Sequence, residues 1–128
     1  EANSVITSPC PEKPMKHGKG LHEIRGIAWT GRGKIRRVDV STDGGDNWRT
    51  AELQEPVLSK ALTRFRLPWT WDGAPALLQS RAIDDTGYVQ PTIEQLRKAR
   101  GLNSIYHKNS IHTWRLNADG TVNNVQII

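Results

Sequence analysis

The stretch STDGGDNW, residues 41–48, carries residue types that could do chemistry, because acidic, amide and hydroxyl side chains lie close together. Three structures fit it: a calcium-binding loop, the aspartate box of sialidase propellers, and a plain hairpin turn. An EF-hand loop that starts at Asp39 fails, because Val40 and Ser41 separate it from the next acid. The aspartate box occurs once, whereas a propeller needs about four or more blades. The sequence therefore predicts a turn, with Trp48 pinning the next strand to the core.

The other titratable residues do not form a pattern typical of catalysis or metal binding. Asp84 and Asp85 are adjacent, but neighbours in a strand point to opposite faces, so we interpret them as residues that anchor a turn. No histidine has a second ligand at a spacing typical of zinc, and we expect His112 to be partly buried in a strand. Cys10 is the single cysteine, which excludes an internal disulfide and a four-thiolate zinc site.

The charge balance leaves a second class of function open. The formal net charge is +5, which mildly favours an anionic partner. A free-standing basic β-sandwich that binds polyanions or nucleic acid through Arg36 and Arg37 is the alternative function, with the tryptophans as stacking platforms. We favour solvated strand faces for the arginines and a core or interface position for Trp29, Trp48 and Trp69. We therefore expect no nucleic-acid partner. No apolar run approaches the roughly 18 to 20 residues that span a bilayer, so we expect no membrane partner either.

The elements that must position these residues are short strands separated by turn chemistry, the spacing typical of an antiparallel β-sandwich. The clearest alternation places Phe65 and Trp71 on one face and Arg64 and Arg66 on the other. The same period places Arg36, Val38 and Val40 on one face and Ile35, Arg37 and Asp39 on the other. The sequence therefore predicts an all-β fold of seven to eight strands. We expect strands at residues 21–29, 34–41, 47–53, 63–71, 76–84, 110–116 and 121–128.

One segment departs from the strand pattern. Thr92 is followed three residues later by Gln95, as in a capping box, and Gly101 is placed to end a helix. This pattern predicts at most one short helix, between residues 93 and 99.

The chain divides into two regions. Residues 1–20 form a short strand and a loop rich in proline, glycine and lysine, and residues 21–128 form the folded body. Because the chain begins at Glu1 and carries no initiator methionine, we expect it to be part of a longer protein.

Four motifs in order resemble one family. GIAWTGRGKIRRVDVSTDGGDNWRTAEL, residues 26–53, resembles the C-terminal dimerisation domain of the sulfite oxidase family of molybdenum oxidoreductases. The family pattern is G-x-A-W-[ST]-G-x-G followed by R-V-[DE]-V-S-x-D-G-G-x-x-W. A strand with Trp69 and Trp71, then RAIDDTGYVQP, then ARGL agree in order. The tail from residue 98 looks more like the sulfane dehydrogenase molybdenum subunit of bacterial sulfur oxidation than like an animal sulfite oxidase.

The resemblance implies an immunoglobulin-like fold and a non-catalytic role, in which residues 21–128 form a homodimer. It also implies a preceding cofactor domain that holds molybdopterin and supplies the metal's cysteine ligand, so Cys10 is not that ligand. This fragment would then hold no cofactor or metal and would not be an enzyme alone. Its parent would be a periplasmic, molybdenum-dependent sulfite or sulfane oxidoreductase, with a c-type cytochrome as partner.

The resemblance points to one substrate-binding residue. In the family an arginine of an L-R-G segment reaches the pocket that binds the sulfur oxyanion, and Arg100 holds the matching position in ARG. A guanidinium suits an oxyanion because it offers paired donors and stays charged. An arginine in the last turn of a helix also stabilises the helix dipole, so both roles remain open for Arg100.

Overall fold

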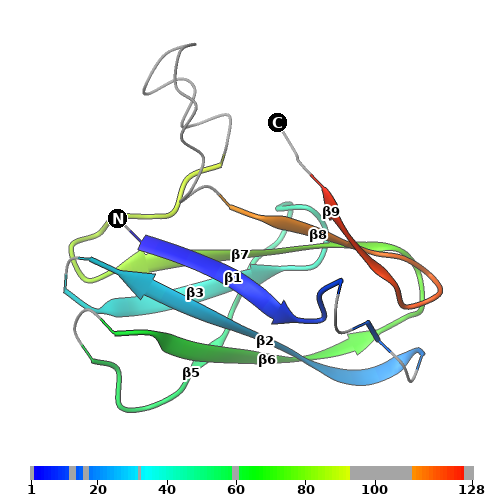
Figure 1. The fold of residues 1–128 in the computed structure, drawn as a ribbon, viewed down its shortest axis with the longest axis horizontal. Coiled ribbons are helices and arrows are strands. Elements are labelled where there is room, and N and C mark those ends of the chain that lie inside the picture. Colours follow the sequence, from blue (N-terminus) through cyan, green and yellow to red (C-terminus); the bar gives the residue numbers. More distant parts are fainter. Residues whose placement is uncertain are drawn as a thin grey trace, which may run out of the picture.

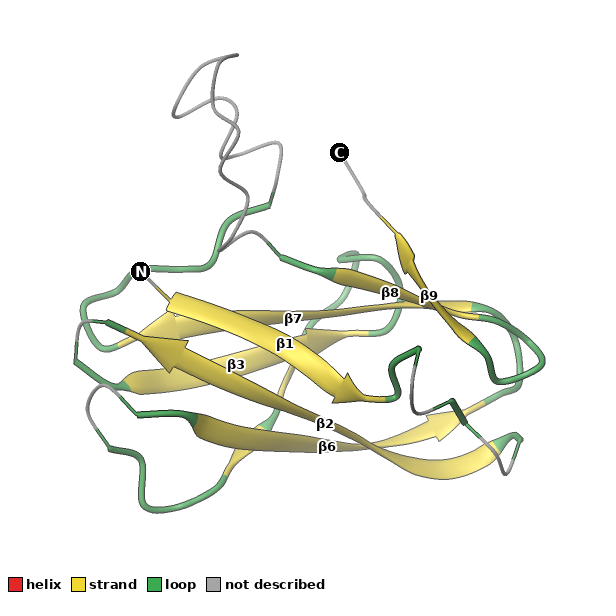
Figure 2. Cartoon of the chain, viewed as in Figure 1, coloured by secondary structure: helices red, strands yellow, loops and turns green. Residues whose placement is uncertain are grey.

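The computed structural model describes residues 2–11, 14–15, 18–31, 33–58, 61–92 and 111–125. Within these ranges the chain forms nine strands and no helix (Figures 1 and 2). The strands are β1 (Ala2–Ser8), β2 (Gly20–Thr30), β3 (Ile35–Ser41), β4 (Arg49–Thr50), β5 (Glu52–Leu53), β6 (Thr63–Trp71), β7 (Ala76–Asp84), β8 (Thr113–Leu116) and β9 (Val122–Val125).

The strands form two antiparallel sheets that pack against each other. Sheet 1 has the strand order β1-β2-β6-β5, and sheet 2 has the order β4-β3-β7-β8-β9. Their facing side chains form one apolar core, and burying each large aliphatic or aromatic side chain contributes roughly 1.5 to 3 kcal/mol. The all-β sandwich predicted from the sequence is confirmed. Core residues are Ile24, Ala28, Val38, Val40, Phe65, Leu67, Trp71, Leu78 and Ala82.

Strand β6 confirms the clearest alternation in the sequence. Phe65, Leu67 and Trp71 are buried, whereas Arg64 and Arg66 are exposed. Because the core side of β6 is apolar and its other side charged, the strand can lie in its sheet with only one face inward.

Strand β3 departs from the predicted period of two. The pairing with β7 shifts between Ile35 and Arg37, so Arg36 and Arg37 are both exposed while Ile35 and Val38 are both buried. A bulge inserts one residue without a partner and turns the residues before it to the other face. The expectation that Ile35 shares a face with Arg37 and Asp39 is therefore wrong, and so is the expectation that Arg36 shares a face with Val38.

The strand expected at residues 47–53 is two short strands, one in each sheet. Strand β4 pairs with β3 and strand β5 pairs with β6. Between them Ala51 is buried, and its N–H donates to the carbonyl of Val38 at 2.8 Å. The chain crosses from sheet 2 to sheet 1 at this residue, which raises the strand count to nine.

The C-terminal hairpin is confirmed with shorter strands, β8 and β9, joined by a turn in which Asn117 N–H donates to Thr121 O at 2.8 Å. The helix predicted at 93–99 lies outside the described residues. In the part of the chain that the structure describes, no helix has the length and apolar character needed to cross a membrane.

Gly26 of β2 lies against the Phe65 ring, so the core has no room for a side chain at this position. A Cβ there would stand 2.2 Å from Phe65 Cζ and 2.4 Å from the carbonyl oxygen of Val5. We predict that Gly26→Ala lowers the free energy of unfolding by about 2 kcal/mol or more, because β2 or the ring must move. Gly31→Ala, whose Cβ would meet no heavy atom within 4 Å, is the control and should change it by under about 0.5 kcal/mol. Equal losses in urea unfolding would contradict this account.

Candidate functional site

The loop 85–91, which follows β7, is held by the buried carboxylate of Asp84, the last residue of that strand. Asp84 is 0% exposed. Its Oδ1 accepts the backbone N–H groups of Thr86 at 3.0 Å and Tyr88 at 3.2 Å, together with the Thr86 hydroxyl. Its Oδ2 accepts the Thr30 hydroxyl at 3.1 Å, which ties the loop to β2. The predicted turn-anchoring role is confirmed for Asp84.

The hydrogen bonds also decide the charge of Asp84. Burial by itself raises the pKa of this carboxyl, but the bonds from Thr86, Thr30 and Tyr88 together outweigh burial, and the net shift of the pKa is downward. Asp84 is therefore ionised at neutral pH and serves as an acceptor rather than as a proton donor.

Gln90 is a second fixed point of the loop, and it joins the two sheets. This side chain is 1% exposed. Its Oε1 accepts the hydroxyl of Ser4 in β1 at 2.6 Å and the N–H of Ala82 in β7 at 3.2 Å. The Ser4 hydroxyl also lies 2.8 Å from the Ser80 hydroxyl. The sequence did not predict this role for Gln90, which was noted only as part of the motif RAIDDTGYVQP, because Ser4 lies far from it in the chain.

The loop ends at a contact that spans a long stretch of sequence. Ile111 N–H donates to the carbonyl of Pro91 at 2.9 Å, so these two residues are neighbours in the fold although they lie far apart in the sequence. Arg100, the predicted substrate-binding residue, lies between these points and outside the described residues. The described site is thus a fixed base, held by Asp84 and Gln90, for the segment that contains Arg100.

The stretch 41–48 is the predicted turn. Ser41 Oγ donates to Asp43 Oδ1 at 2.7 Å and accepts the N–H of Gly45 at 2.9 Å. The two Asp43 oxygens accept the backbone and side-chain N–H groups of Asn47 at 2.9 and 2.8 Å. The aspartate is thus used to close the turn. No group of three or more His, Cys, Asp or Glu among the described residues could hold a metal.

Trp48 holds this turn to sheet 2 from outside the core. The centroid of its ring lies 4.1 Å from the guanidinium carbon of Arg81. Arg81 follows Ser80, which faces β1, so its side chain points to the outer face of the sheet. Arg81 Nη2 donates to Asp39 Oδ2 at 3.1 Å, and Arg37 Nε lies 3.2 Å from Asp39 Oδ1. The expectation that Trp48 packs in the core is wrong, because a cation–π contact stabilises it on the other face.

The sequence motifs that resemble the sulfite oxidase family lie in both sheets, and comparison with known proteins tests that resemblance. The model of the Mo-co oxidoreductase dimerisation domain matches residues 1–114. This chain belongs to that family. The sequence-based assignment to a molybdenum oxidoreductase dimerisation domain is thereby confirmed.

Relatives of the dimerisation domain come from several enzymes. The crystal structure of the sulfane dehydrogenase SoxCD from Paracoccus pantotrophus superposes with a TM-score of 0.95 at 58% identity, over 100% of this chain and 33% of that one. Mitochondrial sulfite oxidase of Rattus norvegicus is 33% identical over 119 residues, 82% of this chain and 20% of that protein. NADH nitrate reductase of Spinacia oleracea is 38% identical over 74 residues, 54% of this chain and 8% of that protein. The domain thus spans a third or less of these relatives.

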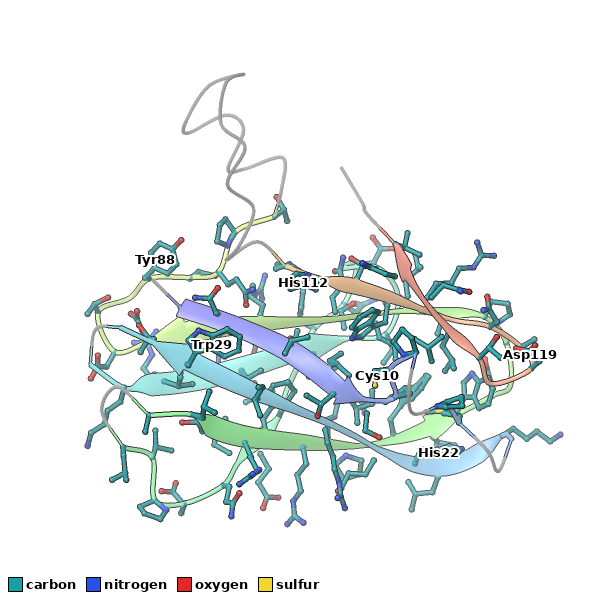
Figure 3. All side chains as sticks on the ribbon, in the orientation of Figure 1. Cys10, His22, Trp29, Tyr88, His112 and Asp119 are labelled. Carbon is teal, nitrogen blue, oxygen red and sulfur yellow. The ribbon has the colours of Figure 1, made fainter. Side chains whose placement is uncertain are left out.

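The resemblance implies one cysteine ligand for the molybdenum of the cofactor, and Cys10 is the single cysteine of the sequence. Cys10 is half-buried in the loop after β1, and His112 is exposed rather than packed as expected (Figure 3). We therefore assign no cofactor ligand to these residues.

The lowered pKa of Asp43 makes the stability of the fold depend on pH in the acid range. Hydrogen bonds from Asn47 and Ser41 hold the pKa of Asp43 at about 2, below its ordinary 3.8. A depressed folded-state pKa stabilises the fold above the unfolded value, and this contribution is lost as the pH falls from 3.8 to about 2. We predict that the thermal midpoint falls over this window and that Asp43→Asn flattens the fall. Asp46→Asn, in the same turn, should leave it unchanged, and identical profiles for Asp43→Asn and the unsubstituted domain would refute the assignment.

Removal of the Asp84 carboxylate should lower the stability of the fold at neutral pH. Asp84→Ala leaves the buried Thr30 hydroxyl and the Thr86 and Tyr88 N–H groups without this acceptor, so we expect the free energy of unfolding to fall by about 2 to 4 kcal/mol. Asp46→Ala, at an exposed aspartate, should change it by less than about 0.5 kcal/mol. Chemical denaturation measures both, and a loss for Asp84→Ala no greater than the control's would contradict the anchoring role.

Proposed function

We propose that this chain is the dimerisation domain of a molybdenum enzyme of the sulfane dehydrogenase type. The observation that carries the proposal is the 58% identity with that enzyme over the whole of this chain. The sulfite oxidase relative is 33% identical over 82% of the chain, so the comparison favours sulfane sulfur over sulfite as the substrate.

In the proposed enzyme the domain builds a homodimer and performs no redox chemistry itself. Molybdopterin and the metal's cysteine ligand belong to a preceding domain of the same chain. A c-type cytochrome partner and a periplasmic location are part of the same proposal, and both rest on the likeness to the sulfane dehydrogenase.

Arg100 would then lend its guanidinium to the pocket that binds the sulfur substrate. The fixed base of its segment supports this role, since Asp84, Gln90 and the bond between Pro91 and Ile111 define where the segment begins and ends. A residue that binds a substrate must be held within a fraction of an ångström, and a rigid attachment makes this possible.

The alternative of a free-standing polyanion-binding sandwich has no support in the comparisons, which match only enzymes among the relatives given above. The charges of the described arginines also argue against it. Arg25, Arg37, Arg66 and Arg81 each form an ion pair with a carboxylate, so the charges of these four arginines are compensated within the chain.

The role of Arg100 can be tested in the full-length enzyme. We predict that Arg100→Met raises KM for the anionic sulfur substrate by about 10- to 100-fold, because a charge-assisted hydrogen bond contributes roughly 1.5 to 3 kcal/mol. The oligomeric state, measured by light scattering, should not change. Arg115→Met, at an exposed position of β8, is the matched control and should have normal kinetics. Normal kinetics for Arg100→Met as well would show that Arg100 does not contact the substrate.

A further inference from the structure

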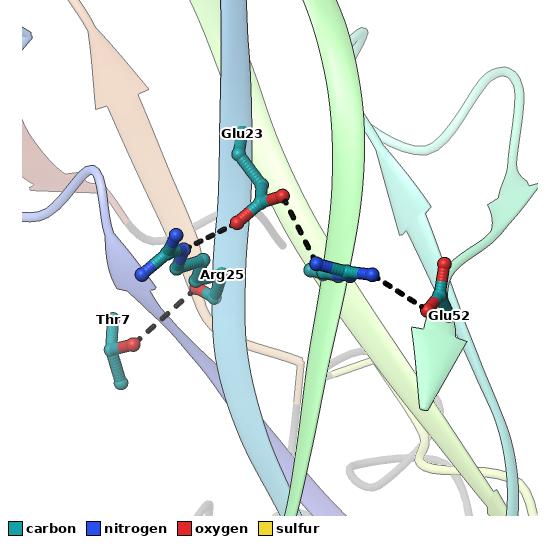
Figure 4. Close-up of polar contacts among 5 residues, drawn as sticks. Thr7, Glu23, Arg25 and Glu52 are labelled. Atoms are coloured by element: carbon teal, nitrogen blue, oxygen red, sulfur yellow. Dashed lines mark hydrogen bonds and ion pairs between the residues drawn. The ribbon is translucent and has the colours of Figure 1, made fainter. Parts of the chain in front are cut away.

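Charged side chains form a row across the outer face of sheet 1 (Figure 4). Because Ile24 and Phe65 point into the core, their neighbours in β2 and β6 point outward. Arg25 Nε donates to Glu23 Oε1, and the other Glu23 oxygen lies 3.9 Å from Arg66 Nη1. Arg66 Nη2 then donates to Glu52 Oε1 in β5 at 2.9 Å. We call the series Arg25, Glu23, Arg66, Glu52 the charge row.

The strand register explains why the row is held together and why its ends are free. Arg25 pairs with Arg66 directly across the strands, and like charges in such a pair repel. Glu23 contacts both guanidinium groups and compensates this repulsion. The hydrogen bond from Arg66 to Glu52 raises the pKa of the guanidinium. The terminal side chains, Arg25 and Glu52, are 68% and 64% exposed and can therefore bind a second set of charges.

Apolar side chains lie beside the charge row on the same face. Val5 of β1 pairs with Ile27 of β2, and Trp29 lies further along β2 (Figure 3). All three are half-buried in the single chain. The row itself borders an open hollow of about 940 Å³, which Arg64 and Glu55 also line. Apolar and aromatic groups next to a polar rim are typical of protein interfaces.

We propose that this outer face of sheet 1 is the surface through which two copies of the chain associate. The inference rests on the proposed dimerisation function and adds the surface and its orientation. The charge row reads positive, negative, positive, negative from Arg25 to Glu52. A two-fold axis that lies in the contact plane, perpendicular to the row, reverses this order in the second copy. Arg25 then faces Glu52 of the second copy, and Glu23 faces its Arg66, so the surface is complementary to itself.

A second copy fits this surface better than other occupants. A polyanion would meet Glu23 and Glu52 as well as the arginines, and a purely basic or acidic protein would match only half of the row. The alternation of sign therefore selects a partner with the same row in reverse, which is a copy of this chain.

Two opposite charge reversals test the proposal. Arg25→Glu alone places two glutamates at each contact between Arg25 and Glu52 positions, and Glu52→Arg alone places two arginines there. Each variant should raise the dimer Kd at least about tenfold, because like charges brought together cost more than one factor of ten in affinity. Mixed in equal amounts, the two variants restore both contacts, since each chain then meets the opposite charge. We expect the mixture to form a heterodimer with a Kd near that of the unsubstituted chain.

The rescue cannot come from repair within one chain. Within one chain, Arg25 contacts Glu23 and Glu52 contacts Arg66. After mixing, Arg25→Glu therefore still places a glutamate beside Glu23, and Glu52→Arg still places an arginine beside Arg66. Sedimentation with one variant enlarged by a tag distinguishes heterodimers from homodimers. Arg115→Glu changes the charge equally on β8 of the other sheet and should leave the Kd unchanged. Thermal unfolding of each variant checks that the fold is intact.

The outcomes separate this inference from the proposed function. If the unsubstituted chain dimerises but the single variants dimerise equally well, the surface lies elsewhere and the dimerisation function stands. If the single variants are monomers and their mixture stays monomeric, the reversed pairing of the charge row is wrong. If the unsubstituted chain is a monomer at high micromolar concentration, both autonomous dimerisation and this surface are overturned, while the family assignment stands.

Discussion

The side-chain amide of Gln90 is the interaction on which the rest of the structure depends. It is buried between the sheets, where its oxygen accepts hydrogen bonds from the Ser4 hydroxyl of β1 and from the backbone N–H of Ala82 in β7. A buried amide without these partners would destabilise the fold by roughly 1 to 3 kcal/mol, so β1 and β7 must keep their relative positions. The requirement extends along the chain, since the next residue, Pro91, forms the contact with Ile111. The packing of the two sheets and the contact between Pro91 and Ile111 thus share a single constraint.

The two outer faces of the sandwich differ in what covers them. The turn at residues 41–48 lies over sheet 2: Gly44 N–H donates to the carbonyl of Leu77 at 3.1 Å, and Trp48 stacks on Arg81. Gly44 and Gly45 have φ of 76° and 99°, which lets the turn approach the sheet without a Cβ between them. No comparable turn lies over the charge row of sheet 1 in the described part of the chain. The covered face stabilises the monomer, and the other face is available for a partner.

The sequence predicts those features that depend on neighbours along the chain. Alternation in β6, the closed turn around Asp43 and the anchoring by Asp84 follow from local chemistry, and the structure has them all. The features that were missed depend on register. A one-residue bulge reverses Ile35, and a crossing at Ala51 divides one strand between two sheets. The charge row exists because Arg25, Arg66 and Glu52 become opposite one another in three strands, and no spacing in the sequence encodes that pairing.

The bond between Pro91 and Ile111 has a consequence for the evolution of the family. Because it joins two residues that lie far apart in the sequence, it keeps the described loop after β7 and the approach to β8 together. Closing a longer loop costs little, about 0.6 kcal/mol for each doubling of its length. A change in the number of residues between Pro91 and Ile111 would therefore cost the sandwich little stability. A domain built in this way can vary in length at this point while the described strands keep their arrangement.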